Sequence, residues 1–392
     1  MAAVDFAAFD ADNHYYEAED AFIRHLDPAW RKRCMQWAEI DGRRRLLVAG
    51  RVNRFIPNPT FDPVARPGCL DDYFRGRVSV SDMREAFGEL EPISPAYRER
   101  EARLALMDEQ GLEGCLLFPT LAVGMEAALE HDPPALLAAF DAFNRWLDDD
   151  WGFAHRDRIF TAGYLTLVDP DWCLDQIERM LGRGLRVVNI RPTSVVDGAG
   201  GRRSLGHRLH EPVWRRLEEA GVAVAMHSGD ASYGHLVEHW GLPSEFEAFR
   251  YDPLRSLLTM SPISDAVASL IADGVLSAHP GLRIATIENG SEWVAPLVRK
   301  LEKTYAQHRH AFDEDPVEVL RRQVWVSPYY EDDLVGLAGV LGTERMIFGS
   351  DYPHAEGLAD PVSFVDDLEG FDSAAIRRIM RDNARELVGL AA

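Results

Sequence analysis

The sequence predicts an α/β protein folded as a (β/α)8 TIM barrel, and three observations lead to this fold class. Eight short apolar runs are nearly continuous in hydrophobicity, as expected of strands that are buried on both faces. Helical patterns fall between most of these runs, which is the alternation of a parallel sheet covered by helices. No GxGxxG motif follows the first run, so a closed barrel fits better than a doubly wound open sheet. We expect residues 1–392 to form a single barrel domain.

The expected strands follow one another along the whole chain. The first reads "VDFAAFDADNH" and the last reads "RMIFGSDYP". β-Branched and aliphatic residues dominate the runs, which favours strands over loops. The expected strands are residues 4–14, 114–120, 160–169, 185–193, 222–230, 282–290, 324–330 and 345–353.

Helical stretches lie between or after these strands. One of them has clear ends, because Asp169 can cap its first turn ahead of Pro170 and glycines follow its last turn. The expected helices are residues 95–111, 132–152, 169–184, 211–221, 264–274, 290–309, 330–342 and 373–390.

Residues 29–95 do not fit the repeat, because they separate the first strand from its first helix. A hairpin that turns on Asp41-Gly42 is predicted near their start. The segment after it is rich in proline and aromatic residues and is expected to be irregular. An insertion after a barrel strand lies at the active-site face. We therefore interpret residues 29–95 as a lid or an oligomerisation contact.

The composition excludes several classes of function. The formal charge of −22 repels phosphate backbones and argues against nucleic-acid binding. The four cysteines form no CxxC pair, which is typical of a reduced cytoplasmic protein. The sequence shows no signal peptide and no run of about 18 apolar residues. We expect a cytoplasmic protein with a small-molecule substrate and no membrane partner.

Polar side chains gather where the expected strands end. Asp12 and His14 are two residues apart, so their side chains point to the same side of the first strand. Any one of them could be a hydrogen-bonded or turn-capping residue, but the ends of four strands show the same kind of side chain. In a barrel these ends form the catalytic rim. The sequence therefore predicts a divalent metal site. Its expected ligands are Asp12, His14, His227, Glu288 and Asp351.

Four motifs carry a family resemblance. "DADNHYYE", "HSGD", "IENG" and "FGSDYPHAEG", in this order and spacing, resemble the amidohydrolase superfamily. The similarity is to its amidohydrolase-2 branch, which includes aminocarboxymuconate-semialdehyde and resorcylate decarboxylases and several hydrolases. It covers most of the chain outside residues 29–95. The resemblance implies a barrel with a divalent metal at the C-terminal strand ends. It also implies that Asp351 acts as the proton acceptor in a hydrolase.

The sequence departs from the family pattern at two positions. Asp12 stands where the family usually has the first His of His-x-His, a change that some decarboxylases share. Glu288 stands where many members have His. His279 precedes the sixth strand and is interpreted as structural. The extra carboxylates would repel one another unless cations lie between them. One or two ions of Zn, Mn or Fe are therefore expected.

Further side chains are candidates for a second metal or for the substrate. Arg191 ends the fourth strand, where it could bind a substrate carboxylate or form a salt bridge at the rim. Glu17, His235 and His354 lie near the predicted ligands in the chain. Aromatic residues are expected to line the mouth or to pack the lid: Tyr15, Tyr16, Tyr233, Trp240, Tyr329 and Tyr330.

The predicted activity is that of a metal-dependent hydrolase. It would act on a small organic amide, lactone or related carbonyl compound through a metal-activated water. Asp351 would serve as general base and Glu288 as a ligand or second acid/base. Two alternatives stay open. Asp12 supports a non-oxidative decarboxylase, and the carboxylate-rich set supports a dinuclear non-haem iron oxygenase. A non-catalytic barrel is disfavoured by the retained ligands, and the aromatic-rich insertion favours a homo-oligomer.

Overall fold

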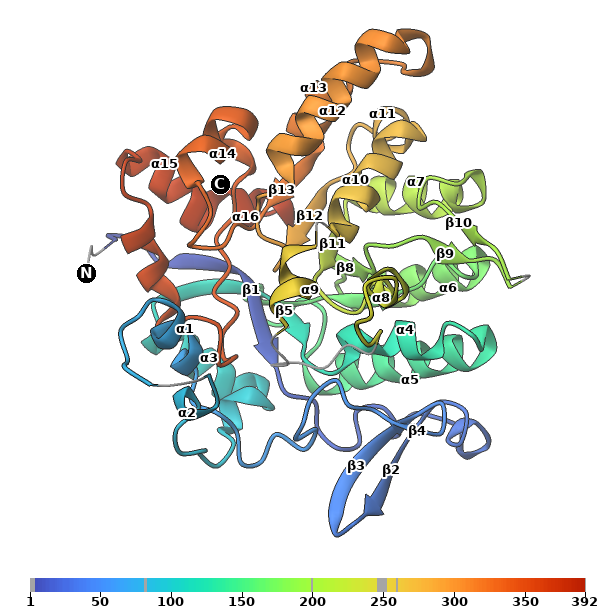
Figure 1. Ribbon diagram of the computed structural model, residues 1–392, viewed down its shortest axis with the longest axis vertical. Helices are drawn as coiled ribbons and strands as arrows, with labels where there is room; N and C mark the ends of the chain where they lie inside the picture. The colour runs from blue at the N-terminus through green and yellow to red at the C-terminus, as the bar shows by residue number, and fades with distance from the viewer. Residues whose placement is uncertain (1–3, 81–82, 199, 245–251, 259, 392) are drawn as a thin grey trace.

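The strands in the middle of the molecule are parallel, and helices surround them (Figure 1). The computed structural model describes residues 4–80, 83–198, 200–244, 252–258 and 260–391. Parts of the predicted insertion (81–82) and of the loop after the fifth strand (245–251 and 259) lie outside the described residues. The barrel strands are β1 Ala8–Tyr15, β5 Leu112–Pro119, β6 Ile159–Thr161, β7 Gly163–Leu165, β8 Val187–Ile190, β11 Ala223–His227, β12 Ile284–Ile287 and β13 Val324–Val326.

Two parallel sheets make up the barrel wall, in the orders β1-β5-β6 and β13-β12-β11-β8-β7. Ala162 joins β6 to β7 within one continuous run of chain. The predicted third strand therefore pairs with β5 through Ile159 and, after this interruption, with β8 through Gly163. One predicted strand thus serves both sheets and connects them.

The predicted eighth strand closes the barrel without forming a regular ladder. The Ile347 N–H donates to the Val326 carbonyl at 3.0 Å, and the Ala11 N–H donates to the Phe348 carbonyl at 2.9 Å. Single bridges also join Val326 to Met346 and Asn13 to Tyr352. The run at 345–353 thus lies between β13 and β1, as expected of a (β/α)8 barrel. It does not form a regular strand, so the expectation of eight regular strands was wrong at this position.

Each of the eight predicted helical stretches contains a helix, but the helix at Pro316–Gln323 and several short helices were not predicted. Asp169 caps its helix as expected, because its carboxylate accepts hydrogen bonds from the Asp171 and Trp172 amides. The predicted C-terminal helix is interrupted, because a π-helical turn at Arg378–Asp382 separates two short α-helices. The longer helices are α3 Arg100–Glu109, α5 Pro133–Asp150, α6 Pro170–Leu181, α7 Glu211–Ala220, α10 Pro262–Ala272, α12 Val294–Gln307, α13 Pro316–Gln323 and α14 Leu334–Leu341. The shorter ones are α4 Met125–Leu129, α8 Gly234–Glu238, α9 Pro253–Leu257, α11 Val275–Ala278, α15 Ser373–Arg377 and α16 Asn383–Leu387.

An inner apolar cluster fills the barrel and leaves only its C-terminal mouth for polar side chains. All of these barrel strands except β7 contribute apolar residues to it, and Leu387 of α16 packs at its base. A second, larger cluster lies between the strands and the surrounding helices. The inner cluster's members from the barrel wall, including Ala162 between β6 and β7 and Ile347 of the 345–353 run, are Phe9, Ala11, Leu116, Phe118, Phe160, Ala162, Val187, Ala223, Ala225, Ala285, Ile287, Trp325 and Ile347.

The insertion at 29–95 has two parts. A hairpin of β2 Met35–Ile40 and β3 Arg43–Val48, followed by β4 Arg51–Val52, projects away from the barrel (Figure 1). It turns on Asp41-Gly42 as predicted, and both residues have positive φ, 52° and 67°, as a type I′ turn requires. The second part runs over the mouth and contains α1 Cys69–Phe74 and α2 Met83–Ala86.

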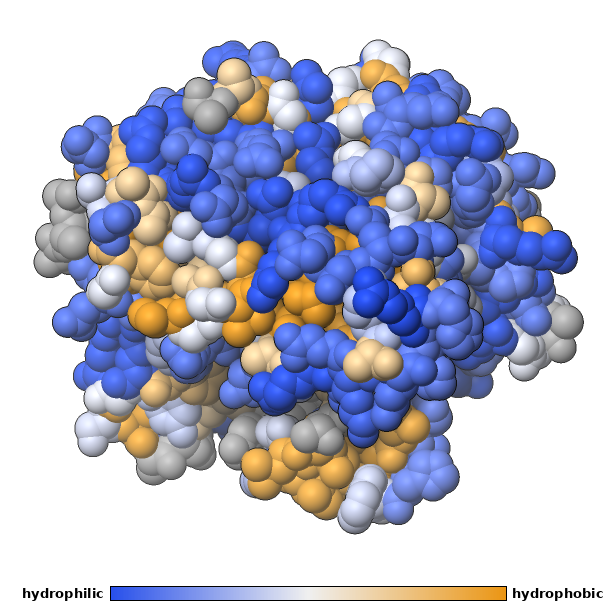
Figure 2. Space-filling view, turned by 90° about the horizontal axis from the view of Figure 1, so that it is seen from above, coloured by the Kyte–Doolittle hydropathy of each residue, from blue (hydrophilic) through white to orange (hydrophobic). Residues whose placement is uncertain are grey.

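One face of the molecule is largely hydrophilic. Hydrophilic side chains dominate the face shown in Figure 2, although apolar side chains gather near its centre and its lower edge. Among the described residues, no helix has the length and apolarity needed to cross a membrane.

Candidate metal centre

A bulge in β1 turns two candidate ligands into the barrel. Asp10 pairs with Cys115 and Asn13 pairs with Leu117, so Ala11 and Asp12 together oppose a single residue of β5. Phe9, before this irregularity, and Ala11, within it, both belong to the inner cluster. The extra residue shifts the alternation, so that the side chains of Asp12 and His14 also face inward after it.

The first group of donors contains Asp12, His14 and His227, all of them buried. The His14 Nε2 atom lies 3.2 Å from Asp12 Oδ1 and 3.2 Å from His227 Nε2. The His227 Nε2 atom lies 3.4 Å from the same Asp12 oxygen. Two ring nitrogens and one carboxylate oxygen thus converge on one point, as the ligands of a divalent cation would.

The hydrogen bonds behind the two imidazoles orient them for this role. The His14 Nδ1–H faces the Pro119 carbonyl at 3.1 Å, and the His227 Nδ1–H faces the Ser228 carbonyl at 2.7 Å. With Nδ1 as the donor, the lone pair is on Nε2, which is the arrangement found in metal-binding histidines. Asp12 Oδ1 is buried and has no hydrogen-bond partner. A cation at this point would satisfy all three atoms.

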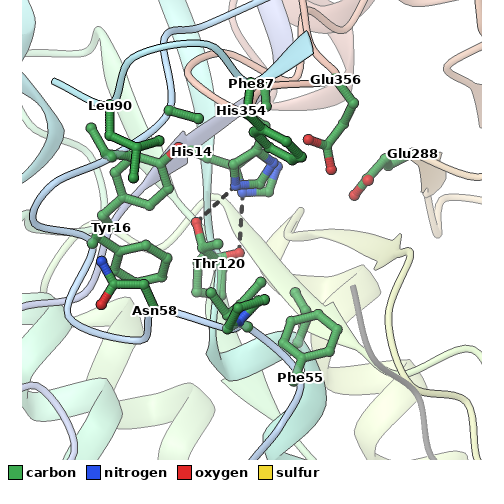
Figure 3. A pocket seen from close by; sticks show the side chains of 18 of the residues that line it. His14, Tyr16, Phe55, Asn58, Phe87, Leu90, Thr120, Glu288, His354 and Glu356 are labelled. Atoms are coloured by element: carbon green, nitrogen blue, oxygen red, sulfur yellow. Dashed lines mark hydrogen bonds between the residues drawn. The ribbon is translucent and has the colours of Figure 1, made fainter. Parts of the chain in front are cut away.

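The second group of donors comes from the ends of β12 and of the 345–353 run. Asp351 Oδ1 lies 3.2 Å from His14 Nε2 and 2.5 Å from His354 Nδ1, and Glu288 Oε2 lies 3.3 Å from His227 Nε2. Glu356 completes a carboxylate triad with Glu288 and Asp351. Figure 3 shows the Glu288 and Glu356 carboxylates pointing toward one another beside the imidazoles of His14 and His354.

Backbone strain accompanies both of these strand ends. Glu288 has a φ of 54° and Asp351 a φ of 55°, a left-handed conformation that non-glycine residues rarely adopt. Such strain persists only where the surrounding structure enforces it, and it clusters at functional sites. Here it accompanies the turn of the chain at which each carboxylate enters the mouth.

Glu356 was not predicted from the sequence, and a tight loop brings it to the site. The Leu358 N–H donates to the Ser350 carbonyl at 2.8 Å, which folds the loop back on itself. A Cβ atom at Gly357 would lie 2.4 Å from the Asp351 carbonyl oxygen, so only glycine permits this approach. The available signal was an acidic residue followed by glycine in "PHAEG".

Burial and like charges control the protonation of the centre. Burial, with the charge of Asp351 as the next cause, raises the pKa of Glu288 well above its usual range. Burial, with the charge of Glu356, does the same to the pKa of Asp351. Burial lowers the pKa of His14 to about 3, so that imidazole is neutral. Burial also opposes the charged form of His227, but Asp12 and Glu288 outweigh it and raise that pKa. The centre therefore attracts positive charge, either as protons or as cations.

Asp10 holds the two ligand-bearing segments together from behind. Its Oδ1 accepts hydrogen bonds from the Asp12 and Ser350 amides, both at 3.0 Å. Its Oδ2 accepts from the Asn13 amide group at 2.8 Å and from the Ser350 hydroxyl at 2.5 Å. Arg103, also fully buried, donates to Asn13 and to the His14 carbonyl. These contacts fix the positions of Asp12, His14 and Asp351 relative to one another.

Several other predicted residues lie outside the described donor groups. Glu17 Oε1 accepts hydrogen bonds from the Leu121 and Ala122 amides, at 2.8 and 2.9 Å. Arg191 donates to Glu130 at 3.0 Å and to Ser232. His235 is exposed, and its Nδ1 faces the Ser232 carbonyl. His279 contacts Glu218 at 2.9 Å, which agrees with a structural role. Of the four additional candidates, only His354 lies among the donors.

The predicted aromatic residues are distributed unevenly around the mouth. Tyr16 lines the cavity above the donors. Tyr329 donates its hydroxyl hydrogen to the Glu288 carbonyl at 2.6 Å. The others pack elsewhere: Tyr15 lies against Trp146 and Trp151, Tyr233 donates to Asp265, Tyr330 lies under Arg75, and Trp240 is exposed.

A cavity of 870 Å³ opens directly above the donors. Its floor includes His14, His227, Glu288, His354 and Glu356. Its wall is built largely by the insertion, and Figure 3 shows Phe55, Phe87 and Leu90 around the polar end. Donor groups and cavity together form a site in which a bound organic molecule would touch the candidate metal ligands.

Comparison with known proteins places the chain within a known family. A family model described as "Amidohydrolase" matches residues 91–390. A curated relative, the 2-amino-3-carboxymuconate-6-semialdehyde decarboxylase of Dictyostelium discoideum, is 21% identical over 197 residues. That match covers 46% of this chain, and it spans only about half, 48%, of the relative's length.

Solved structures show the same fold. An amidohydrolase from Mycobacterium avium subsp. paratuberculosis K-10 superposes with a TM-score of 0.93 at 45% identity, covering 100% of both chains. The 2,6-dihydroxybenzoate decarboxylase from Rhizobium has a TM-score of 0.56 at 20% identity, covering 83% of this chain and 96% of its own. The 5-carboxyvanillate decarboxylase from Novosphingobium aromaticivorans, solved with manganese, has a TM-score of 0.58 at 17% identity, covering 98% and 97%. These likenesses confirm the predicted TIM barrel.

Proposed function

The chain belongs to the amidohydrolase family, and on that premise we propose that it is a metal-dependent hydrolase that binds two divalent cations. The observation that carries the proposal is the set of three overlapping donor groups at the barrel mouth, which share His14 and Asp351. A single cation needs only one such group. Three overlapping groups with four carboxylates suit a pair of cations better.

The charges support two cations rather than one. Asp12, Glu288, Asp351 and Glu356 bring four potential negative charges together at the barrel mouth. Two divalent cations would balance them, whereas one would leave carboxylates that repel each other. Asp12, His14 and His227 would hold one cation, and Glu288, Asp351 and Glu356 would hold the other, with His354 behind Asp351. The mixed oxygen and nitrogen donors fit Mn, Fe or Zn.

Hydrolysis requires a proton acceptor close to the reacting carbonyl group, and Asp351 is the best-placed candidate. Bound cations would polarise the substrate carbonyl and make water more acidic. Asp351 would take a proton from the attacking water and return it to the leaving nitrogen or oxygen as the acyl bond breaks. His354 orients Asp351 through the 2.5 Å contact, and its Nε2 lies 2.9 Å from the Thr120 hydroxyl. Glu288 would serve as a ligand or a second acid/base.

Two other reactions have specific support. Four carboxylates combined with histidines resemble the donor composition of di-iron carboxylate proteins, which favours a dinuclear iron oxygenase. The named activities of the distant relatives, and the carboxylate at Asp12, favour a non-oxidative decarboxylase. An oxygenase would transfer one atom of O₂ to the substrate and reduce the other to water with two electrons from a reductant.

Metal analysis and isotope labelling test these proposals together. We expect about two divalent cations per chain by elemental mass spectrometry, and fewer in Glu356→Gln, while Glu302→Gln on the exposed face of α12 keeps both. One cation or fewer per wild-type chain refutes the proposed two-cation centre. Product oxygen derived from labelled water identifies a hydrolase, oxygen derived from O₂ identifies an oxygenase, and release of CO₂ without either identifies a decarboxylase.

A cytoplasmic location, a homo-oligomeric state and a lid role for residues 29–95 stay predictions. All four cysteines are buried and free, which fits a reducing compartment. The second part of the insertion lines the cavity, which fits a lid. Light scattering of the purified protein would give the oligomeric state.

A further inference from the structure

The cavity above the donors has a composition that selects a class of substrate. We infer that the substrate is a bulky, uncharged and largely apolar molecule with one oxygen-bearing group directed at the donors. This inference rests on the proposed function, because the donor end is taken to be where the reaction occurs. It describes the substrate more specifically than the small amide, lactone or related carbonyl compound that the sequence predicts.

The wall of the cavity is apolar over most of its extent. The insertion supplies two stretches of wall, residues 55–65 and 83–90, and the barrel supplies Pro119 and Val123. Asn58 and Arg84 are the polar side chains of these two stretches, and the other polar side chains of the lining lie toward the donor end. The apolar wall residues from the insertion are Phe55, Ile56, Pro57, Phe61, Pro63, Val64, Ala65, Met83, Phe87 and Leu90.

The cavity is large for a small amide. Its 870 Å³ lies in the upper part of the range of about 300–1,000 Å³ that is typical of pockets for drug-sized ligands. A small amide bound at the donors would leave most of the apolar wall in contact with water. A substrate that extends from the donors to Phe87 and Leu90 would cover it and gain the corresponding hydrophobic free energy.

The charges of the lining argue against an anionic substrate tail. Among the described residues that line the cavity, Arg84 is the one lysine or arginine, and Glu288 and Glu356 are acidic. Two cations would leave the donor end close to neutral. Arg84 already interacts within the protein, so the wall offers little to hold a second carboxylate or a phosphate, whose burial without a partner is costly.

Packing contacts hold the wall in place. The Phe61 ring stacks on Tyr16 with centroids 4.4 Å apart, and the Tyr16 ring lies 5.8 Å from that of His354. Val64 and Glu91 exchange two backbone hydrogen bonds of 2.8 Å. The Leu70 N–H donates to the Ala355 carbonyl at 2.7 Å, next to the donor Glu356. The apolar wall is thus part of the same packed unit as the donors.

Binding of alkyl hydroxamic acids to the metal-loaded protein tests the inference by calorimetry. The hydroxamate group can reach the cations, while the alkyl tail probes the wall. We expect affinity to rise by up to about fourfold for each added methylene from acetohydroxamic to octanohydroxamic acid. Replacing the terminal methyl by a carboxylate should weaken binding at least tenfold. A change below threefold across the alkyl series, or equal binding of the carboxylate-tailed compound, overturns the inference.

Matched variants locate the effect on the wall. Ile56→Asp places a carboxylate in the wall and should weaken octanohydroxamate binding at least tenfold while leaving acetohydroxamate binding unchanged. Val52→Asp, in the same insertion but outside the cavity, should change neither. Equal octanohydroxamate binding by wild type and Ile56→Asp contradicts the inference.

A metal-free measurement separates this inference from the proposed function. Nile red, a neutral apolar dye, should bind the metal-free protein and be displaced by octanamide but not by acetamide. If it does so while no hydroxamate binds the metal-loaded protein, the apolar cavity stands and the metal centre fails. If hydroxamates bind without any dependence on tail length, the metal centre stands and the apolar substrate is refuted.

Discussion

Cation binding should expel protons from the barrel mouth, because the centre holds protons when no metal is present. Titrating Mn²⁺ into metal-free protein near pH 7 should release about two protons per chain. These come chiefly from Glu288 and Asp351, whose pKa values are raised well above their usual range by burial and by neighbouring carboxylates.

The donor distances indicate how strong this effect is. The facing oxygens of Glu288, Asp351 and Glu356 all lie within 4.8 Å of one another. Two ionised carboxylates at that separation repel by about 3.5 kcal/mol at an effective dielectric constant of 20. Three ionised carboxylates would suffer this repulsion in three pairs, so protons remain bound until cations replace them. Because protons compete with cations, affinity should rise with pH, by about tenfold per pH unit for each proton released.

Calorimetry in two buffers of different ionisation enthalpy measures the proton count directly. Glu288→Gln should release about one proton fewer than the wild type, whereas Glu302→Gln should release the same number. Release of less than about half a proton, together with an affinity that does not change between pH 6 and 8, would show that the carboxylates are ionised without metal and would refute the reasoning.

Three further substitutions test the supporting structure. Burial raises the pKa of Glu17 to about 7, so its contribution to stability is complete below about pH 4.5 and is lost as pH rises through 7. The side chain in Glu17→Gln does not titrate. Thermal unfolding should therefore show that the stability of this variant relative to wild type increases by about 3 kcal/mol between pH 4.5 and pH 8, with unchanged metal content. A stability difference that stays constant with pH contradicts this expectation. Arg103→Met leaves the Ala96 and His14 carbonyls unsatisfied and should lower the free energy of unfolding by about 3 kcal/mol in urea titrations, whereas exposed Arg215→Met should have little effect. His354→Ala removes the 2.5 Å contact to Asp351 and should weaken Mn²⁺ binding by about 10–100-fold in calorimetry, and unchanged affinity would remove His354 from the centre.

The barrel and the first donor group could be predicted because both follow from local patterns. Continuous apolar runs show where strands lie, and the C-terminal ends of parallel strands meet at one face, so Asp12, His14, His227, Glu288 and Asp351 could be placed together. The structure does bring them together. Their role as metal ligands stays a prediction.

Other features depend on tertiary contacts that a linear pattern does not contain. Glu356 reaches the donors only because the loop folds back at Gly357, where a Cβ would collide with the Asp351 carbonyl. Glu17, three residues after His14, meets the amides of Leu121 and Ala122 instead of the donors. The irregular pairing of 345–353 likewise depends on its two neighbouring strands. Closeness in sequence to a predicted ligand is therefore a weak guide to which residues join the donors once the strand has ended.

The position of the donors along the chain has a consequence for folding. Asp12 and His14 lie near one end of the polypeptide and Asp351 near the other, and they meet where the loosely paired run 345–353 closes the barrel. A cation held by both segments would fasten the barrel at this seam. Ligand binding and ring closure would then be thermodynamically coupled, since a metal that binds only the closed form favours closure by mass action. Metal binding should therefore slow amide hydrogen exchange most strongly in β1 and at residues 345–353. The effect should be much smaller at β8, on the far side of the ring.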